Sequence, residues 1–112
     1  MDNKKYYKPL PKNLTIINSP IDGLGLFADE DIQADTCLGL SHIYNVSYKD
    51  EYIRTPLGGF INYNEDPNCE TSKTYAGQET YVDSNNLYLW SLRNIKRGEE
   101  LTLKYRLYNP TE

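Results

Sequence analysis

The stretch that decides the fold of this chain is Ile95-Lys96-Arg97-Gly98-Glu99-Glu100-Leu101-Thr102-Leu103-Lys104-Tyr105. Arg97-Gly98 is a turn signal, and the residues that follow alternate between apolar and polar. Leu101, Leu103 and Tyr105 therefore share one face, which is typical of a half-buried strand. The stretch predicts a hairpin whose last strand ends in an inward-facing tyrosine.

The same pattern occurs earlier in the chain. Phe27 is followed five residues on by Ile32, then by the turn residue Asp35 and by Leu38-x-Leu40. Trp90, Ile95, Gly98 and Leu101-x-Leu103 repeat this spacing. Asp35 and Gly98 stand where a positive φ is expected. Two similar ridges that face each other would build a compact all-β core, although two unrelated hairpins can share such a pattern by chance.

The remaining sequence also favours short strands. Apolar or alternating runs between turn signals predict strands at Leu14-Thr15-Ile16-Ile17, Leu24-Gly25-Leu26-Phe27-Ala28, 36–40, Leu87-Tyr88-Leu89-Trp90 and 101–105. The best helical candidate is Ser47 to Arg54, which is about two turns long. We therefore expect an all-β protein with few short helices.

Composition limits the classes of function. The chain has 112 residues and a net charge of −4, with a pI near 5.0 and a mean hydropathy of −0.72. One domain is expected, 1–112. The acidic balance argues against direct binding of nucleic acid and favours cationic partners such as lysine-bearing peptides. No apolar run approaches the roughly 18 residues of a membrane span, and residues 1–8 have no apolar signal region, so we expect a cytoplasmic protein that does not bind membranes.

Few residues suit metal or hydrolytic chemistry. Cys37 and Cys69 are the two cysteines, and in an intracellular setting free thiols are favoured over a disulfide. His42 is the single histidine, and an ordinary partly buried role is favoured over catalysis. This set does not make a zinc site, so no metal site is expected.

Two further segments have features that suit ligand binding. In Ser19-Pro20-Ile21-Asp22-Gly23-Leu24-Gly25-Leu26-Phe27-Ala28 the glycines allow a ligand to approach the backbone, although a turn and a bulge would explain them equally well. The segment lacks the third glycine and the helix of a dinucleotide fingerprint. In Gly58-Gly59-Phe60-Ile61-Asn62-Tyr63-Asn64-Glu65-Asp66-Pro67-Asn68-Cys69 an apolar run enters a block of amides and acids, which is either a site or an Asx-rich loop.

In this order the three segments resemble the SET domain of protein-lysine methyltransferases. Gly23 to Ala28 is similar to the first cofactor motif of that family, and Phe60 to Cys69 to its Asn-His-Ser-x-x-Pro-Asn-Cys signature. Gly98 to Tyr105 is similar to the family's Gly-Glu-Glu-Leu-Thr-x-x-Tyr ending. The resemblance covers residues 14–108 approximately, except for residues 44–57, which have no match in the family pattern. Stand-alone domains of this minimal size are similar to those encoded by large viruses.

The resemblance implies a β-clip fold with a C-terminal pseudoknot, and methyl transfer from S-adenosyl-L-methionine to a protein lysine. The domain would comprise an N-terminal arm (1–12), a first cofactor segment (14–43), a short variable insert (44–57) and a catalytic segment (58–108). Asn62 would receive the α-ammonium group of the cofactor, and Tyr105 would be catalytic. The other implied cofactor residues are Gly23, Leu24, Gly25, Leu26 and Tyr63, and those of the substrate channel are Leu103, Tyr75 and Tyr108.

Two departures from the family pattern leave alternatives open. Tyr63 and Asn64 replace the His and Ser of the signature, and no cysteine cluster follows Tyr105 to close the channel. Leu107 and Tyr108, or the second subunit of a homodimer, would have to close it instead. A catalytically degenerate SET-like module that binds a protein or peptide is the main alternative. A small β-clip structural or virion protein is another.

Overall fold

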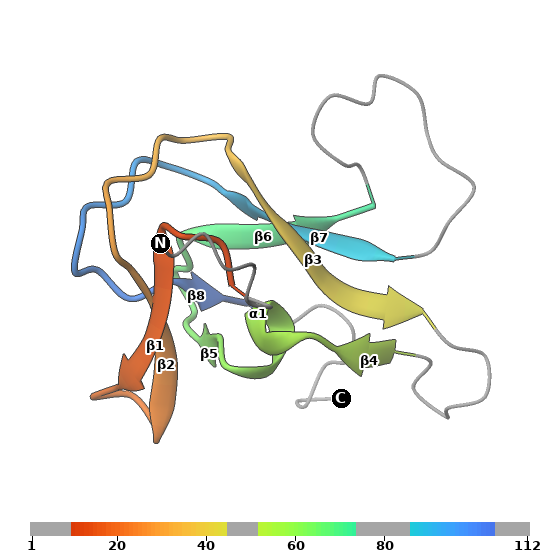
Figure 1. Ribbon diagram of the computed structural model, residues 1–112, viewed down its shortest axis with the longest axis horizontal. Helices are drawn as coiled ribbons and strands as arrows, with labels where there is room; N and C mark the ends of the chain where they lie inside the picture. Colours follow the sequence, from red (N-terminus) through yellow and green to blue (C-terminus); the bar gives the residue numbers. More distant parts are fainter. Residues whose placement is uncertain (1–9, 45–51, 74–85, 105–112) are drawn as a thin grey trace, which may run out of the picture.

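The computed structural model describes residues 10–44, 52–73 and 86–104 (Figure 1). Strands dominate these residues, which confirms the predicted mostly-β class. The elements in chain order are β1 (Leu14–Asn18), β2 (Leu24–Ala28), β3 (Cys37–Tyr44), β4 (Tyr52–Arg54), α1 (Pro56–Gly59), β5 (Asn62–Tyr63), β6 (Cys69–Ser72), β7 (Leu87–Ser91) and β8 (Thr102–Leu103). None of the described helices is long and apolar enough to cross a membrane.

The strands form two sheets. β1 and β2 make an antiparallel hairpin, and the other six are ordered β4-β3-β7-β6-β8-β5 (Figure 1). β8 lies between β5 and β6, which are consecutive in the chain, and is parallel to both. The end of the described chain is thus inserted beside the Asn-containing loop. This is the threading that the resemblance to SET domains implies for the C-terminal pseudoknot.

The internal repeat is a real feature of the fold. The two copies meet at Ile32 and Ile95, whose backbone N–H groups donate to each other's carbonyl oxygens at 2.7 Å. Asp35 has φ 59° and Gly98 has φ 92°, as predicted. The Asp35 N–H donates to the Ser91 carbonyl at 2.9 Å, and the equivalent bond joins Gly98 to the carbonyl of Ala28 at 2.8 Å. The two copies therefore bond to each other through equivalent positions.

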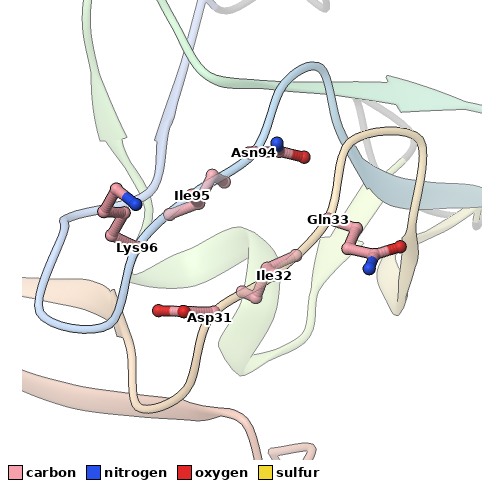
Figure 2. A pocket seen from close by; sticks show the side chains of 6 residues that line it. All are labelled: Asp31, Ile32, Gln33, Asn94, Ile95 and Lys96. Carbon is pink, nitrogen blue, oxygen red and sulfur yellow. The ribbon is translucent and has the colours of Figure 1, made fainter.

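A pocket of about 210 Å³ lies where the two copies meet (Figure 2). Equivalent segments of the two copies line it, 31–33 and 94–96. The Asp31 carboxylate accepts the Arg97 N–H, and the side-chain Oδ1 of Asn94 accepts the Ala34 N–H, both at 2.8 Å. Because these side chains already hold the two turns in place, the pocket serves the fold and is a poor candidate for a functional site.

One apolar core joins both copies of the repeat. The buried side chains of this cluster are Leu14, Leu26, Ala28, Ile32, Leu38, Leu57, Ile61, Cys69, Leu89, Ile95, Leu101 and Leu103. Both cysteines are free thiols, as predicted, and burial raises the pKa of Cys69 to about 12. The core therefore draws on every segment singled out from the sequence.

Two local predictions are wrong. A helix was expected from Ser47 to Arg54, but Tyr52–Arg54 form β4, which pairs with β3; residues 47–51 lie outside the described part. A two-turn helix is marginal alone, so pairing with a neighbouring strand overrides it. The one described helix is instead Pro56–Gly59, where the Thr55 hydroxyl caps the Leu57 N–H at 3.2 Å.

The last strand also differs from its prediction. Thr102 is 5% exposed and its neighbours Leu101 and Leu103 are 0% and 4% exposed, so β8 is buried on both faces and not half-buried. The face that bears the Thr102 side chain is covered by Asn68, whose N–H donates to the Thr102 hydroxyl at 3.2 Å. Alternation of side chains indicates a solvent-facing side only where one face of the sheet is free.

His42 is a buried residue of β3, 3% exposed. Its Nδ1 lies 2.9 Å from the Ser41 hydroxyl, and its ring edge contacts Tyr52. A methyl group on Gly58 would overlap the Ser41 carbonyl oxygen and crowd the imidazole. Burial, and secondarily the charge of Arg54, lower the pKa of His42 to about 4. The ring is therefore neutral at pH 7 and packs as part of the fold.

The low pKa of His42 predicts acid sensitivity. Because the folded state disfavours the protonated ring, the unfolded state binds the proton first, near the reference pKa of 6.5. The free energy of unfolding should fall by about 1 to 2 kcal/mol between pH 7 and 5, after allowance for solvent screening. Urea denaturation at several pH values measures it. The slope should be much smaller in His42→Gln, since the chain has one histidine; an equal slope in both proteins would contradict the assignment.

Candidate functional site

The candidate site is centred on Asn62, the first residue of β5. Ile61 precedes it and is 2% exposed, so the core anchors the strand at this point. The Asn62 amide points at the turn of the β1–β2 hairpin. Its Nδ2 lies 3.2 Å from the Asp22 carbonyl oxygen and 3.3 Å from that of Leu24. The amide and the first cofactor segment, which are about 40 residues apart in the chain, therefore meet as expected.

The hairpin turn is shaped by a glycine and a serine. Gly23 has φ 48°, a conformation that glycine adopts at no steric cost. The Ser19 N–H donates to the Gly23 carbonyl at 2.8 Å, and the Ser19 hydroxyl accepts the Ile21 N–H at 2.9 Å. These bonds close the turn and direct its carbonyl oxygens toward Asn62.

Glu100 is the third component, and it comes from the segment just before β8. The Ser19 hydroxyl donates to its carboxylate, with Oε1 at 2.9 Å and Oε2 at 2.8 Å. Nδ2 of Asn62 donates to the same Oε2 at 2.8 Å. Residues from three distant parts of the chain thus form one polar cluster: Ser19, the carbonyl groups of Asp22 and Leu24, Asn62 and Glu100.

Sequence reasoning missed Ser19 and Glu100 as members of the site. Both lie inside the quoted motifs, but nothing in a motif says which of its side chains faces a ligand. The available signal was Gly25, where a methyl group would overlap the Glu100 carboxylate and the β-carbon of Ser19. Gly25 lacks the positive φ of Gly23, so it is a glycine because of space and not because of backbone conformation.

Asn68 holds the segment that carries Glu100. Its Nδ2 donates to the Glu100 carbonyl at 2.9 Å, and its Oδ1 accepts the Thr102 N–H at 2.8 Å. Asn68 is 3% exposed. The side chain thus makes both bonds that a neighbouring strand would make, and it fastens the chain beside β6 just before β8 begins.

The other predicted site residues lie in different surroundings. Leu26 and Leu103 are in the apolar core, and their carbonyl oxygens accept the N–H groups of Leu101 at 2.7 Å and Asn64 at 3.2 Å. Tyr63 follows Asn62 and is 39% exposed. Its hydroxyl donates to Glu65, and this hydrogen bond raises the pKa of Tyr63. Three predicted residues fall outside the described residues: Tyr75, Tyr105 and Tyr108.

Comparison with known proteins identifies the family. The profile of the SET domain matches residues 41–106, more than half of the chain. This chain belongs to the SET domain family. A SET domain accounts for the all-β architecture and for the insertion of β8 between β5 and β6.

Curated relatives and a solved structure agree with this. A histone-lysine N-methyltransferase of Chaetomium globosum, H3 lysine-36 specific, is 25% identical over 134 residues, covering 95% of this chain and 14% of the relative. The protein of the same description from Mycosarcoma maydis is 26% identical, and the match covers 94% of this chain and 13% of that relative. This SET domain thus spans about a seventh of those relatives. A crystal structure of a candidate histone methyltransferase of Plasmodium falciparum has the same fold, with a TM-score of 0.64, 20% identity, and coverage of 87% of this chain and 96% of that one.

Proposed function

We propose that this SET domain transfers a methyl group from S-adenosylmethionine to the ε-amine of a lysine in a protein. The observation that carries the proposal is the convergence of three motifs on one place, with the Asn62 amide beside both the β1–β2 turn and Glu100. Motifs that lie far apart in the sequence and meet at a half-buried polar cluster are typical of a binding site. The acidic net charge of −4 suits a basic, lysine-rich target.

The chemistry of the cluster fits the amino-acid part of the cofactor. An α-ammonium group donates three hydrogen bonds, and the cluster offers carbonyl oxygens of Asp22 and Leu24 and the carboxylate of Glu100. The neighbouring side chains of Ile21 and Leu24 are 47% and 46% exposed, and they provide apolar surface for the rest of a ligand. The residues present therefore suit this cofactor.

The chain's own contribution to transfer is alignment. When bound, S-adenosylmethionine supplies a methyl group on a positively charged sulfur, which the lone pair of a neutral lysine nitrogen displaces in line. The β1–β2 turn and Asn62 hold the ligand at a fixed position relative to β8. We assign to Tyr105, two residues beyond Leu103, the orientation of the incoming amine through its hydroxyl. Enclosure by apolar and aromatic side chains would lower the pKa of that lysine and favour its neutral form.

Cofactor binding is the first test of this function. Calorimetry should detect S-adenosylmethionine binding to the wild type, and Asn62→Ala should weaken it at least about tenfold, because the amide positions the turn. Asn64→Ala is the matched control, since its side chain accepts only the Asp66 N–H at 2.8 Å. It should bind like the wild type.

Transfer itself needs a second measurement. A labelled methyl group should appear on lysine when the protein and labelled cofactor are incubated with a cell extract. Absence of cofactor binding would overturn the proposed function and favour a protein-binding module without catalysis. Light scattering tests whether the protein forms a homodimer, one of the two ways in which the channel could be closed. The cytoplasmic location of the protein stays a prediction.

A further inference from the structure

The amide of Asn62 is surrounded by more acceptors than it can satisfy. Four acceptor atoms lie 2.8 to 3.3 Å from its Nδ2: Ser19 Oγ, the carbonyl oxygens of Asp22 and Leu24, and Glu100 Oε2. An amide nitrogen carries two hydrogens. At least two acceptors therefore receive no hydrogen from it at any moment. The cluster has spare acceptor capacity directed at one point.

Within residues 10–44, 52–73 and 86–104, the carboxylate of the cluster has no cationic partner. Glu100 is half-buried, and the ion pairs formed in the described part of the chain, Arg93–Glu99 and Lys104–Glu65, do not include it. In the described residues its carboxylate accepts hydrogen bonds from two neutral groups, the Ser19 hydroxyl and the Asn62 amide. A partly desolvated carboxylate gains most from a cationic partner that also donates hydrogen bonds.

The fold reserves space for this carboxylate. Gly25 has no positive φ, yet any side chain there would overlap Glu100. Nδ2 of Asn68 donates a hydrogen bond to the backbone carbonyl of Glu100 at 2.9 Å. The position of Glu100 is therefore fixed by two residues. Gly25 on β2 leaves room for its carboxylate, and the buried Asn68 before β6 holds its backbone.

We propose that Glu100 is the counter-ion of the cofactor's α-ammonium group, and that Asn62 acts mainly as the positioning residue that holds the carboxylate and the turn together. This proposal rests on the proposed function and deepens it. The carbonyl oxygens of Asp22 and Leu24 supply the other acceptors for the ammonium hydrogens. It revises the sequence-based expectation, in which the amide of Asn62 received the ammonium group by itself.

The test removes the charge from the protein and the ammonium group from the ligand. The two probes are S-adenosylhomocysteine and its deaminated analogue, which keeps the adenosine, the thioether and the carboxylate. In Glu100→Gln we expect the affinity for S-adenosylhomocysteine to fall about 10- to 100-fold, as for loss of a charge-assisted hydrogen bond. The affinity for the deaminated analogue should change less than about threefold, or improve. Calorimetry measures both.

Glu99→Gln is the matched control. Its carboxylate pairs with Arg93 at 3.1 Å on the exposed surface, so it should bind both probes like the wild type. Equal weakening of both probes in Glu100→Gln would show that Glu100 only shapes the turn and would overturn the proposal. Unchanged binding of S-adenosylhomocysteine would overturn it as well.

The wild type provides a check that does not depend on folding of a variant. It should prefer S-adenosylhomocysteine over the deaminated analogue by at least about tenfold. A ratio near one, with both probes bound, would reject the counter-ion role and leave the proposed function standing. Binding of neither probe would reject both.

Discussion

Tyr105→Phe is expected to lower the rate of methyl transfer by about 100-fold or more while cofactor binding stays within twofold of the wild type. The substitution removes one hydroxyl, and we assign to that hydroxyl the orientation of the lysine amine. Loss of a single well-placed polar group in a reaction centre costs rates of this order. Single-turnover transfer of a labelled methyl group, with calorimetry on the same preparation, separates the two effects.

Tyr44→Phe is the control for that experiment. Tyr44 is at the end of β3, and its ring packs edge-on against Tyr52 with centroids 5.8 Å apart, a contact that phenylalanine retains. Three strands separate β3 from β5 in the sheet. This variant should keep full transfer. A Tyr105→Phe protein as active as Tyr44→Phe would remove Tyr105 from the reaction.

Asn68→Ala should have the largest effect on stability. The substitution leaves the Glu100 carbonyl and the Thr102 N–H without partners in a buried position. Each unsatisfied group costs about 1 to 3 kcal/mol, so we expect the free energy of unfolding to fall by about 2 to 4 kcal/mol. Urea denaturation measures the loss.

The comparison is again with Asn64→Ala, an asparagine four residues earlier in the same loop. Its side chain makes one exposed bond, to the Asp66 N–H at 2.8 Å, so the loss should stay below about 1 kcal/mol. Similar losses in the two variants would mean that Asn68 does not fasten β8. A markedly larger loss in Asn68→Ala would support its role in the threaded arrangement.

The site was only partly predictable because a motif names residues without their directions. Asn62 and the turn at Gly23 were expected to meet, and they do. Leu103 lies in the apolar core, and its place in the substrate channel stays a prediction. Glu100 lies in the same motif, and its side chain reaches the cluster at Ser19.

The helix expected at 47–54 shows the limit of local patterns. Tyr52–Arg54 pair with β3 through Ile43 and Ile53. A short segment has little preference of its own, so the partner available in the folded chain decides its conformation. Such a partner lies outside any window of sequence that a periodicity argument examines.

The sequence by itself determined the β class, the repeat that unites Ile32 with Ile95, and membership of the three motifs in one family pattern. These features depend on local spacing and on residues such as Gly98, whose backbone conformation is set within a turn. Tertiary structure decided which polar groups face each other: Ser19, Asn62 and Glu100 converge only because β8 is inserted beside β5. Glu100 is 38 residues from Asn62 and 81 residues from Ser19 in the chain. Contacts over such separations arise from packing and strand order, which no local pattern encodes.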